Sequence, residues 1–204
     1  MSFTTYAELQ TSIAGYLARS DLTTEITDFI RLAETRLRRD LRIRQMLTSA
    51  TLTCTPAVAT VAIPSGFLQV SDFVVSGNPV QPLSYESPAL FSRNSRTMDA
   101  GKPKTYTVLA STFLLAPIPD SAITLTLIYS AAPDFLSVTN TSNTFLTVCP
   151  DLLLYASLLE AEPYLMNDAR INTWGTMFDR AINGLTTSDE QGQYSGVPLT
   201  IRAT

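Results

Sequence analysis

The sequence predicts an α+β fold, in which a helical core is formed by two helices at each end of the chain and an antiparallel β-rich domain is inserted between them. Apolar residues recur at helical spacing over residues 5–42, alternate with polar residues from 47 to 129, and return to helical spacing after 150. We therefore expect a discontinuous helical core domain at 1–46 and 148–188, an inserted β-rich domain at 47–147, and an extended C-terminal arm at 189–204.

The first two helices are expected at about 5–18 and 24–42. Thr5 and Glu8 have the spacing of a capping box, which would fix the start of the first helix. The second helix carries one apolar stripe, made of Ile26, Phe29, Ile30, Ala33, Leu37 and Leu41. A stripe of this kind predicts a helix that packs on one side only.

Alternating residues predict strands from Leu47 onward. The clearest strand covers 123–129, where Ile123, Leu125, Leu127 and Tyr129 share one face and two threonines lie on the other. Turn-forming residues at 76–79 separate two further apolar segments. The spacing of strands and turns is typical of a sandwich or a small barrel of roughly 100 residues.

Two helices are predicted after Pro150. The first is apolar on almost every side, since leucines occupy 152, 153, 154, 158 and 159, so its own chain or neighbouring copies must cover it. The second starts at about 168 and has its apolar residues within one arc, namely Ile171, Trp174, Met177, Phe178, Ala181, Ile182 and Leu185.

The composition excludes several classes of protein. Of the 204 residues, 45% are hydrophobic, which indicates an ordinary globular chain, and the net charge of −4 argues against tight wrapping of nucleic acid. Cys54 and Cys149 fit no metal-ligand spacing, and we expect reduced thiols in a protein made in a reducing cytoplasm. With no leader and no apolar run near the ~20 residues that a membrane span needs, no membrane partner is expected.

Signatures of catalysis are missing from the sequence. The chain has no histidine, which is the usual general base and metal ligand, and no nucleophile-elbow, phosphate-loop or dinucleotide motif. Glu160 and Glu162 are two residues apart on a helix and so face different directions, which does not suit paired-carboxylate chemistry. We expect no enzyme, no catalytic residue, no metal site and no cofactor.

Half of the arginines lie within residues 31–44: Arg31, Arg36, Arg38, Arg39, Arg42 and Arg44. One interpretation is a salt-bridged helix flank, since Asp28 and Arg31, and Glu34 and Arg38, have the spacing of intrahelical ion pairs. The other is an interface with an acidic protein surface, because arginine is enriched at interfaces and pairs well with carboxylates. Residues 151–204 hold three arginines against seven acids, so a neighbouring copy would offer such a surface.

The C-terminal arm is polar at first and then alternates. Tyr194, Val197, Leu199 and Ile201 supply its apolar positions. The segment is either a free tail or an arm that adds an edge strand to a neighbouring copy or another partner.

At several positions along nearly the whole chain, the sequence resembles the head-to-tail adaptor (neck or connector) proteins of tailed bacteriophages. The segments that carry the resemblance are 5–9 (TYAEL), 29–41 (FIRLAETRLRRDL), 63–68 (IPSGFL), 102–106 (KPKTY), 115–117 (LAP), 127–129 (LIY), 150–155 (PDLLLY) and 160–165 (EAEPYL), followed by Asp168, Arg170 and Trp174. Their order and spacing, more than any one motif, support the resemblance.

The resemblance implies a structural virion protein at the neck, the junction between head and tail, that is made in a host bacterial cytoplasm. It implies a homo-oligomeric, dodecameric ring beneath the portal protein, which extends the DNA channel and provides the attachment platform for the tail or nozzle protein. Genomic DNA would pass through without specific binding. The alternatives are another phage tail or tail-completion structural protein and, for contrast, a carbohydrate-binding or hydrolytic β-domain.

Overall fold

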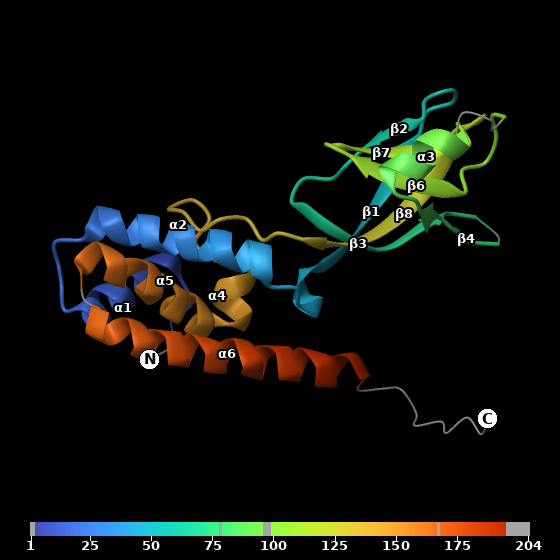
Figure 1. Cartoon of the computed structure of the whole chain (residues 1–204). Coiled ribbons are helices and arrows are strands. Elements are labelled where there is room, and N and C mark those ends of the chain that lie inside the picture. Colours follow the sequence, from blue (N-terminus) through green and yellow to red (C-terminus); the bar gives the residue numbers. More distant parts are fainter. Residues whose placement is uncertain (1–2, 78, 96–98, 167, 195–204) are drawn as a thin grey trace, which may run out of the picture. The chain divides into compact units, whose positions relative to one another are not determined.

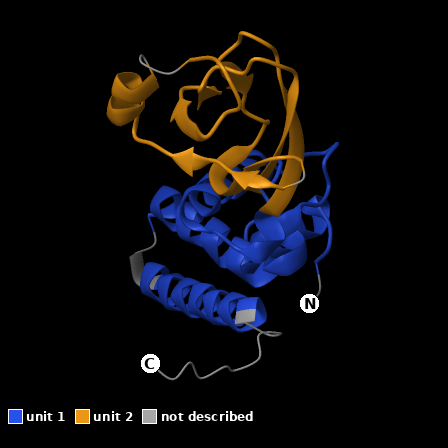
Figure 2. Cartoon of the chain, turned by 90° about the vertical axis from the view of Figure 1, so that its right-hand side faces the viewer, with its two compact units in different colours: residues 1–46, 133–204 blue, residues 47–132 orange. Residues whose placement is uncertain are grey.

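The protein consists of two compact units, residues 1–46 with 133–204 and residues 47–132 (Figure 2). The computed structural model describes residues 3–77, 79–95, 99–166 and 168–194. Six α-helices and two sheets among these residues confirm the predicted α+β class. Each unit is described below by itself.

The first unit is helical. Its elements are α1 (Tyr6–Leu17), α2 (Thr23–Asp40), the short 3-10 helix η1 (Arg44–Met46), α4 (Thr144–Val148), α5 (Pro150–Leu165) and α6 (Asp168–Tyr194) (Figure 1). The predicted capping box is present, because Thr5 accepts from the Glu8 backbone N–H while the Glu8 carboxylate accepts from the Thr5 backbone N–H. The cap of α1 and the position of this helix thus follow the sequence prediction.

Helix α5 is the centre of the helical unit and contacts α1, α2, α4 and α6. Its buried residues include Leu152, Leu153, Leu154, Ala156, Leu158 and Ala161, which lie on all sides of the helix. The sequence predicts that this helix is covered either by its own chain or by neighbouring copies. In the structure, the other helices of its own chain cover it. Burial of this much apolar surface is the main source of stability of the unit.

The second unit is a two-sheet β-sandwich. Its strands are β1 (Leu47–Cys54), β2 (Thr60–Ala62), β3 (Phe67–Val75), β4 (Gln81–Pro82), β5 (Ser84–Tyr85), β6 (Thr105–Leu109), β7 (Thr112–Ala116) and β8 (Ile123–Ala131), with helix α3 (Pro88–Asn94) after β5. The strand orders are β1-β8-β3-β4 and β2-β7-β6-β5. The pairing is antiparallel as predicted, except that β5 and β6 run parallel.

Aromatic rings from both sheets form the core of the sandwich. Phe73 of β3 contacts Tyr106 of β6 and Phe113 of β7 at ring-centroid distances of 5.1 and 5.0 Å. The first and last strands of the unit are neighbours, and Leu47 lies opposite Ser130. The chain therefore enters and leaves the sandwich side by side, which is the arrangement that lets a domain be inserted into another one.

The observed division differs from the expected one at two places. Residues 133–147, expected in the β-rich domain, lie with the helical unit, where the Tyr6 backbone N–H donates to Thr141 O (2.8 Å) and Asn143 caps α4. Residues 189–194, expected in an extended arm, form the last turns of α6, which an ion pair between Arg44 and Asp189 (3.1 Å) attaches to the rest of the unit. Both differences depend on contacts between residues far apart in the sequence.

Candidate interaction surfaces

Two arginines of α2 hold one aromatic ring. The guanidinium carbons of Arg31 and Arg38 lie 3.2 and 3.9 Å from the ring centroid of Phe135. Phe135 belongs to the segment that returns from the β-sandwich, so the two cation–π contacts fasten that segment to α2. These two arginines therefore serve the fold of the helical unit in the first place.

Three more of the six arginines also have partners within the helical unit. Arg36 pairs with Glu160 of α5 (3.6 Å) and lies 4.8 Å from the Phe178 ring centroid. Arg42 donates to the carbonyls of Arg38 and Leu41 at 3.0 and 2.6 Å, which satisfies the C-terminal end of α2. Arg44 donates to Asp189 through its backbone N–H and its side chain.

Arg39 differs from the other five. Its side chain is exposed and makes no hydrogen bond or ion pair with any residue that the structure describes. Leu32, two helical turns earlier on the same side of α2, is 52% exposed. Leu32 and Arg39, an exposed apolar side chain and a cation without an ion pair among the described residues, are therefore candidates for contact with another molecule.

A buried glutamate organises the same region, although its spacing from Arg38 is that of an intrahelical ion pair on a salt-bridged flank, one of the two interpretations of this segment. Glu34 is 1% exposed, and its carboxylate accepts from the backbone N–H of Leu136 (3.0 Å) and from the Asn143 side-chain amide (2.6 Å). Burial raises the pKa of Glu34, with the hydrogen bonds opposing it. No ion pair links Glu34 to Arg38, or Asp28 to Arg31, among the described residues.

The position of Glu34 on the helix could have revealed this role. It follows Ile30 by four residues and precedes Leu37 by three, so it lies on the apolar stripe of α2 that the sequence itself predicts. An acid on a buried stripe needs hydrogen-bond donors, and here they come from a segment about a hundred residues later in the chain.

The two acids near the end of α5 face different elements, as their spacing predicts. Glu160 pairs with Arg36, whereas buried Glu162 accepts from the indole N–H of Trp174 in α6 (2.8 Å). The Trp174 ring is in turn stacked on Tyr155 and meets Tyr16 edge-on, with centroid distances of 6.4 and 5.8 Å. These contacts fix the first half of α6 on α1 and α5.

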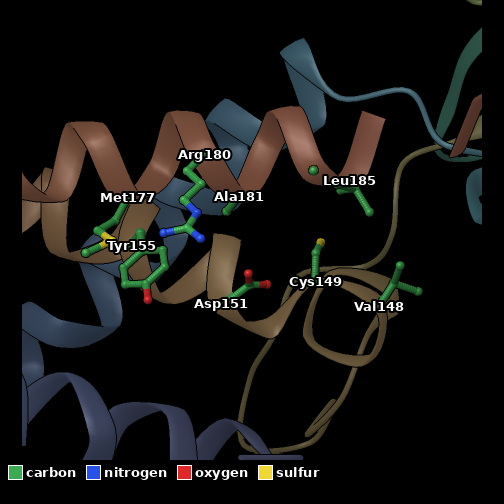
Figure 3. Close-up of a pocket in the computed structure, with 9 residues that line it drawn as sticks. Val148, Cys149, Asp151, Tyr155, Met177, Arg180, Ala181 and Leu185 are labelled. Atoms are coloured by element: carbon green, nitrogen blue, oxygen red, sulfur yellow. The ribbon is translucent and has the colours of Figure 1, made fainter. Parts of the chain in front are cut away.

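The middle of α6, from Met177 to Leu185, leaves an open groove beside α5. The groove has a volume of about 420 Å³ and is lined by Val148, Cys149, Asp151, Tyr155, Met177, Arg180, Ala181, Gly184 and Leu185. Tyr155, Met177 and Arg180 lie toward one end of it, and Val148, Cys149 and Leu185 lie toward the other (Figure 3). Cys149 is buried, and burial, with a smaller effect of Asp151, raises the pKa of its thiol to about 12.

The remaining predicted site residues concern the C-terminal arm. Tyr194 is the last residue of α6. Val197, Leu199 and Ile201 lie outside the described residues.

In the described part of the chain, no three His, Cys, Asp or Glu side chains lie close enough together to hold a metal ion. In the same residues, no helix combines the length and the apolarity needed to cross a membrane.

Together these features define a two-unit α+β protein whose candidate sites are surfaces for contact with other molecules. The family model described as SU10 adaptor protein matches residues 4–202, and the chain belongs to this family of phage head-to-tail adaptor proteins. It is thus a structural phage protein, and the resemblance noted in its sequence is confirmed. No curated protein matches the chain.

Proposed function

We propose that this protein forms a homo-oligomeric, dodecameric ring beneath the portal protein, at the neck of the virion. The ring extends the DNA channel and provides the attachment platform for the tail or nozzle protein. The observation that carries the proposal is the family match over residues 4–202, because it covers both units of the chain. The protein acts by contact alone, without a reaction or a cofactor.

The charge of the chain supports a channel role. A net charge of −4 with no excess of basic residues gives little attraction to DNA phosphates, so a duplex can slide past the ring wall without being held. A strongly basic wall would bind the genome by release of counterions and hinder its passage.

In this proposal, the exposed residues Leu32 and Arg39 of the arginine-rich segment make contacts between copies or with the portal. Arg39 and Leu32 present a cation and an apolar side chain on the exposed side of α2. Arg31, Arg36, Arg38, Arg42 and Arg44 stabilise the helical unit that carries this surface. In a ring each copy uses two different surfaces, so a basic patch on one copy meets a different, more acidic patch on the next.

Mass photometry of the purified chain, alone and with its portal, tests the proposal. The expected result is a dodecameric ring on the portal. A cryo-EM view of the virion neck should place the ring between portal and tail. A chain that stays monomeric with its portal would contradict the proposal, and one that binds only tail components would favour a tail-completion protein.

Two single charge-reversal variants, one on α2 and one control elsewhere, test the α2 surface. Arg39→Glu should weaken ring assembly with unchanged helicity, because Arg39 has no partner among the described residues that the change could remove. Arg93→Glu is the matched control, since Arg93 is exposed on α3 and the change in net charge is the same. Equal assembly of both variants and the parent would remove this surface from the interface.

A further inference from the structure

The groove beside α6 has a mixed lining, and the described part of the chain leaves its apolar residues partly uncovered. Of the apolar residues predicted to form one arc on α6, Phe178 is buried, whereas Met177 is 39% exposed and Ala181 and Leu185 are half-buried. The space beside Gly184 is open, since no atom lies within 4 Å of where its side chain would begin. An extended backbone can therefore approach the helix closely at this point.

We infer that this groove receives the C-terminal segment 195–204 of a neighbouring copy, with Val197, Leu199 and Ile201 on its apolar residues. The inference rests on the proposed ring, because it requires a second copy beside the first. It deepens the ring proposal by naming the surface on one copy and the segment on the next that meet.

The dimensions of segment and groove agree. Met177 and Leu185 are eight residues apart on α6, which corresponds to about 12 Å along the helix. Residues 197–201 in an extended conformation span about 13 Å, and their three apolar side chains point to one side. A strand-like segment of this length would therefore fill the groove from end to end.

The charges agree as well. The groove holds one acid, Asp151, and one base, Arg180, so its lining is neutral overall. Residues 195–201 (SGVPLTI) carry no charge. The segment therefore brings no charge of its own into the groove, and its contacts with Met177, Ala181 and Leu185 would be apolar.

The geometry of the helix end favours a neighbour's segment over the chain's own. Gly192 lies on the same side of α6 as Met177, Ala181 and Leu185, and a side chain at 192 would collide with the Arg44 guanidinium. Arg44 also pairs with Asp189 on the intervening turn. A segment that leaves α6 at Tyr194 and turns back along the groove would have to displace Arg44, whereas a segment from another copy can enter from the open side.

Photo-cross-linking in the assembled ring tests the inference. The photoreactive residue p-benzoylphenylalanine replaces Leu199 in the full chain, and rings are formed from a mixture of ¹⁵N-labelled and unlabelled copies. The expected product joins residue 199 of one copy to an α5 or α6 groove peptide of another, which mass spectrometry recognises as a heavy–light pair. Cross-links only within one copy, or only to the portal or another surface, would overturn the inference.

Two glycine variants supply the matched comparison. Gly184→Trp fills the groove and should reduce the cross-link by about tenfold, whereas Gly175→Trp, on the other side of α6, should leave it unchanged. Neither glycine has an atom within 4 Å of its Cβ position, and glycine is a poor helix former, so both variants should fold. An undiminished cross-link in Gly184→Trp would also overturn the inference.

Mass photometry of the same samples separates the two proposals. Rings that form without the groove cross-link would reject the groove assignment and leave the adaptor function standing. A failure to form rings even on the portal would reject the proposed function and the groove assignment together.

Discussion

Helices α5 and α6 differ both in the distribution of their apolar residues and in their surroundings: α5 is apolar on almost every side, whereas the apolar residues of α6 lie within one arc. Four leucines of α5, at 152, 153, 154 and 158, are buried, whereas α6 buries Phe178 and leaves Met177, Ala181 and Leu185 partly accessible. The difference shows that apolar residues on a helix serve two purposes here. Those of α5 stabilise the fold, and those of α6 remain available for contact with another molecule.

The largest effect expected is a loss of stability in α5. Leu153→Ala should lower the free energy of unfolding by about 2–5 kcal/mol, because it removes a fully buried side chain and leaves a cavity. Leu185→Ala, the matched change in α6, should cost much less, since that side chain is only half-buried. Guanidinium denaturation followed by helical circular dichroism measures both. Equal losses would mean that α6 is as much part of the core as α5.

The next largest loss of stability is expected at the buried carboxylate of Glu34. Glu34→Ala should lower the free energy of unfolding by about 1–3 kcal/mol, because the Leu136 N–H and the Asn143 amide lose their acceptor. Glu34→Gln is the control, since its carbonyl oxygen can accept from both donors. If the two variants lost the same amount, side-chain volume rather than hydrogen bonding would be the cause.

The same glutamate should make the helical unit sensitive to pH. Because burial raises the pKa of Glu34, the unfolded chain releases this proton first, and the unfolding free energy falls as pH rises from about 4.3 through the folded-state pKa. Below about pH 4 both states are protonated and the effect is absent. Glu34→Gln should remove this decline, measured as the difference from the parent in denaturation at several pH values; parallel profiles would contradict it.

The smallest effect is expected at the end of α6. Arg44→Ala removes a surface ion pair with Asp189 and should change global stability by less than about 1 kcal/mol. Amide hydrogen exchange in residues 186–194 should nevertheless become faster, since Arg44 attaches the last turns of the helix. Exchange in α5 serves as the internal control and should be unchanged. An unaltered α6 would show that these turns are helical without the ion pair.

Local patterns in the sequence were sufficient to predict most elements of this fold. The stripe from Ile26 to Leu37 predicted α2, the alternation from Ile123 to Tyr129 predicted β8, and the Thr5–Glu8 spacing predicted the cap of α1. These signals succeed because the period of apolar residues follows directly from the geometry of a helix or a strand. The motifs along the chain also pointed to the adaptor family, which the family match confirms.

Periodicity tells which side of a helix or strand is apolar, but not what will cover it. Three features depend on contacts between residues far apart in the chain: Glu34 accepts hydrogen bonds from residues 136 and 143, β5 and β6 run parallel, and Arg44 pairs with Asp189 near the end of α6. The all-round apolar surface of α5 predicts that this helix must be covered, but not by what. Only the packing of the helices together decides that its own chain covers it, and that the arc of α6 stays partly open.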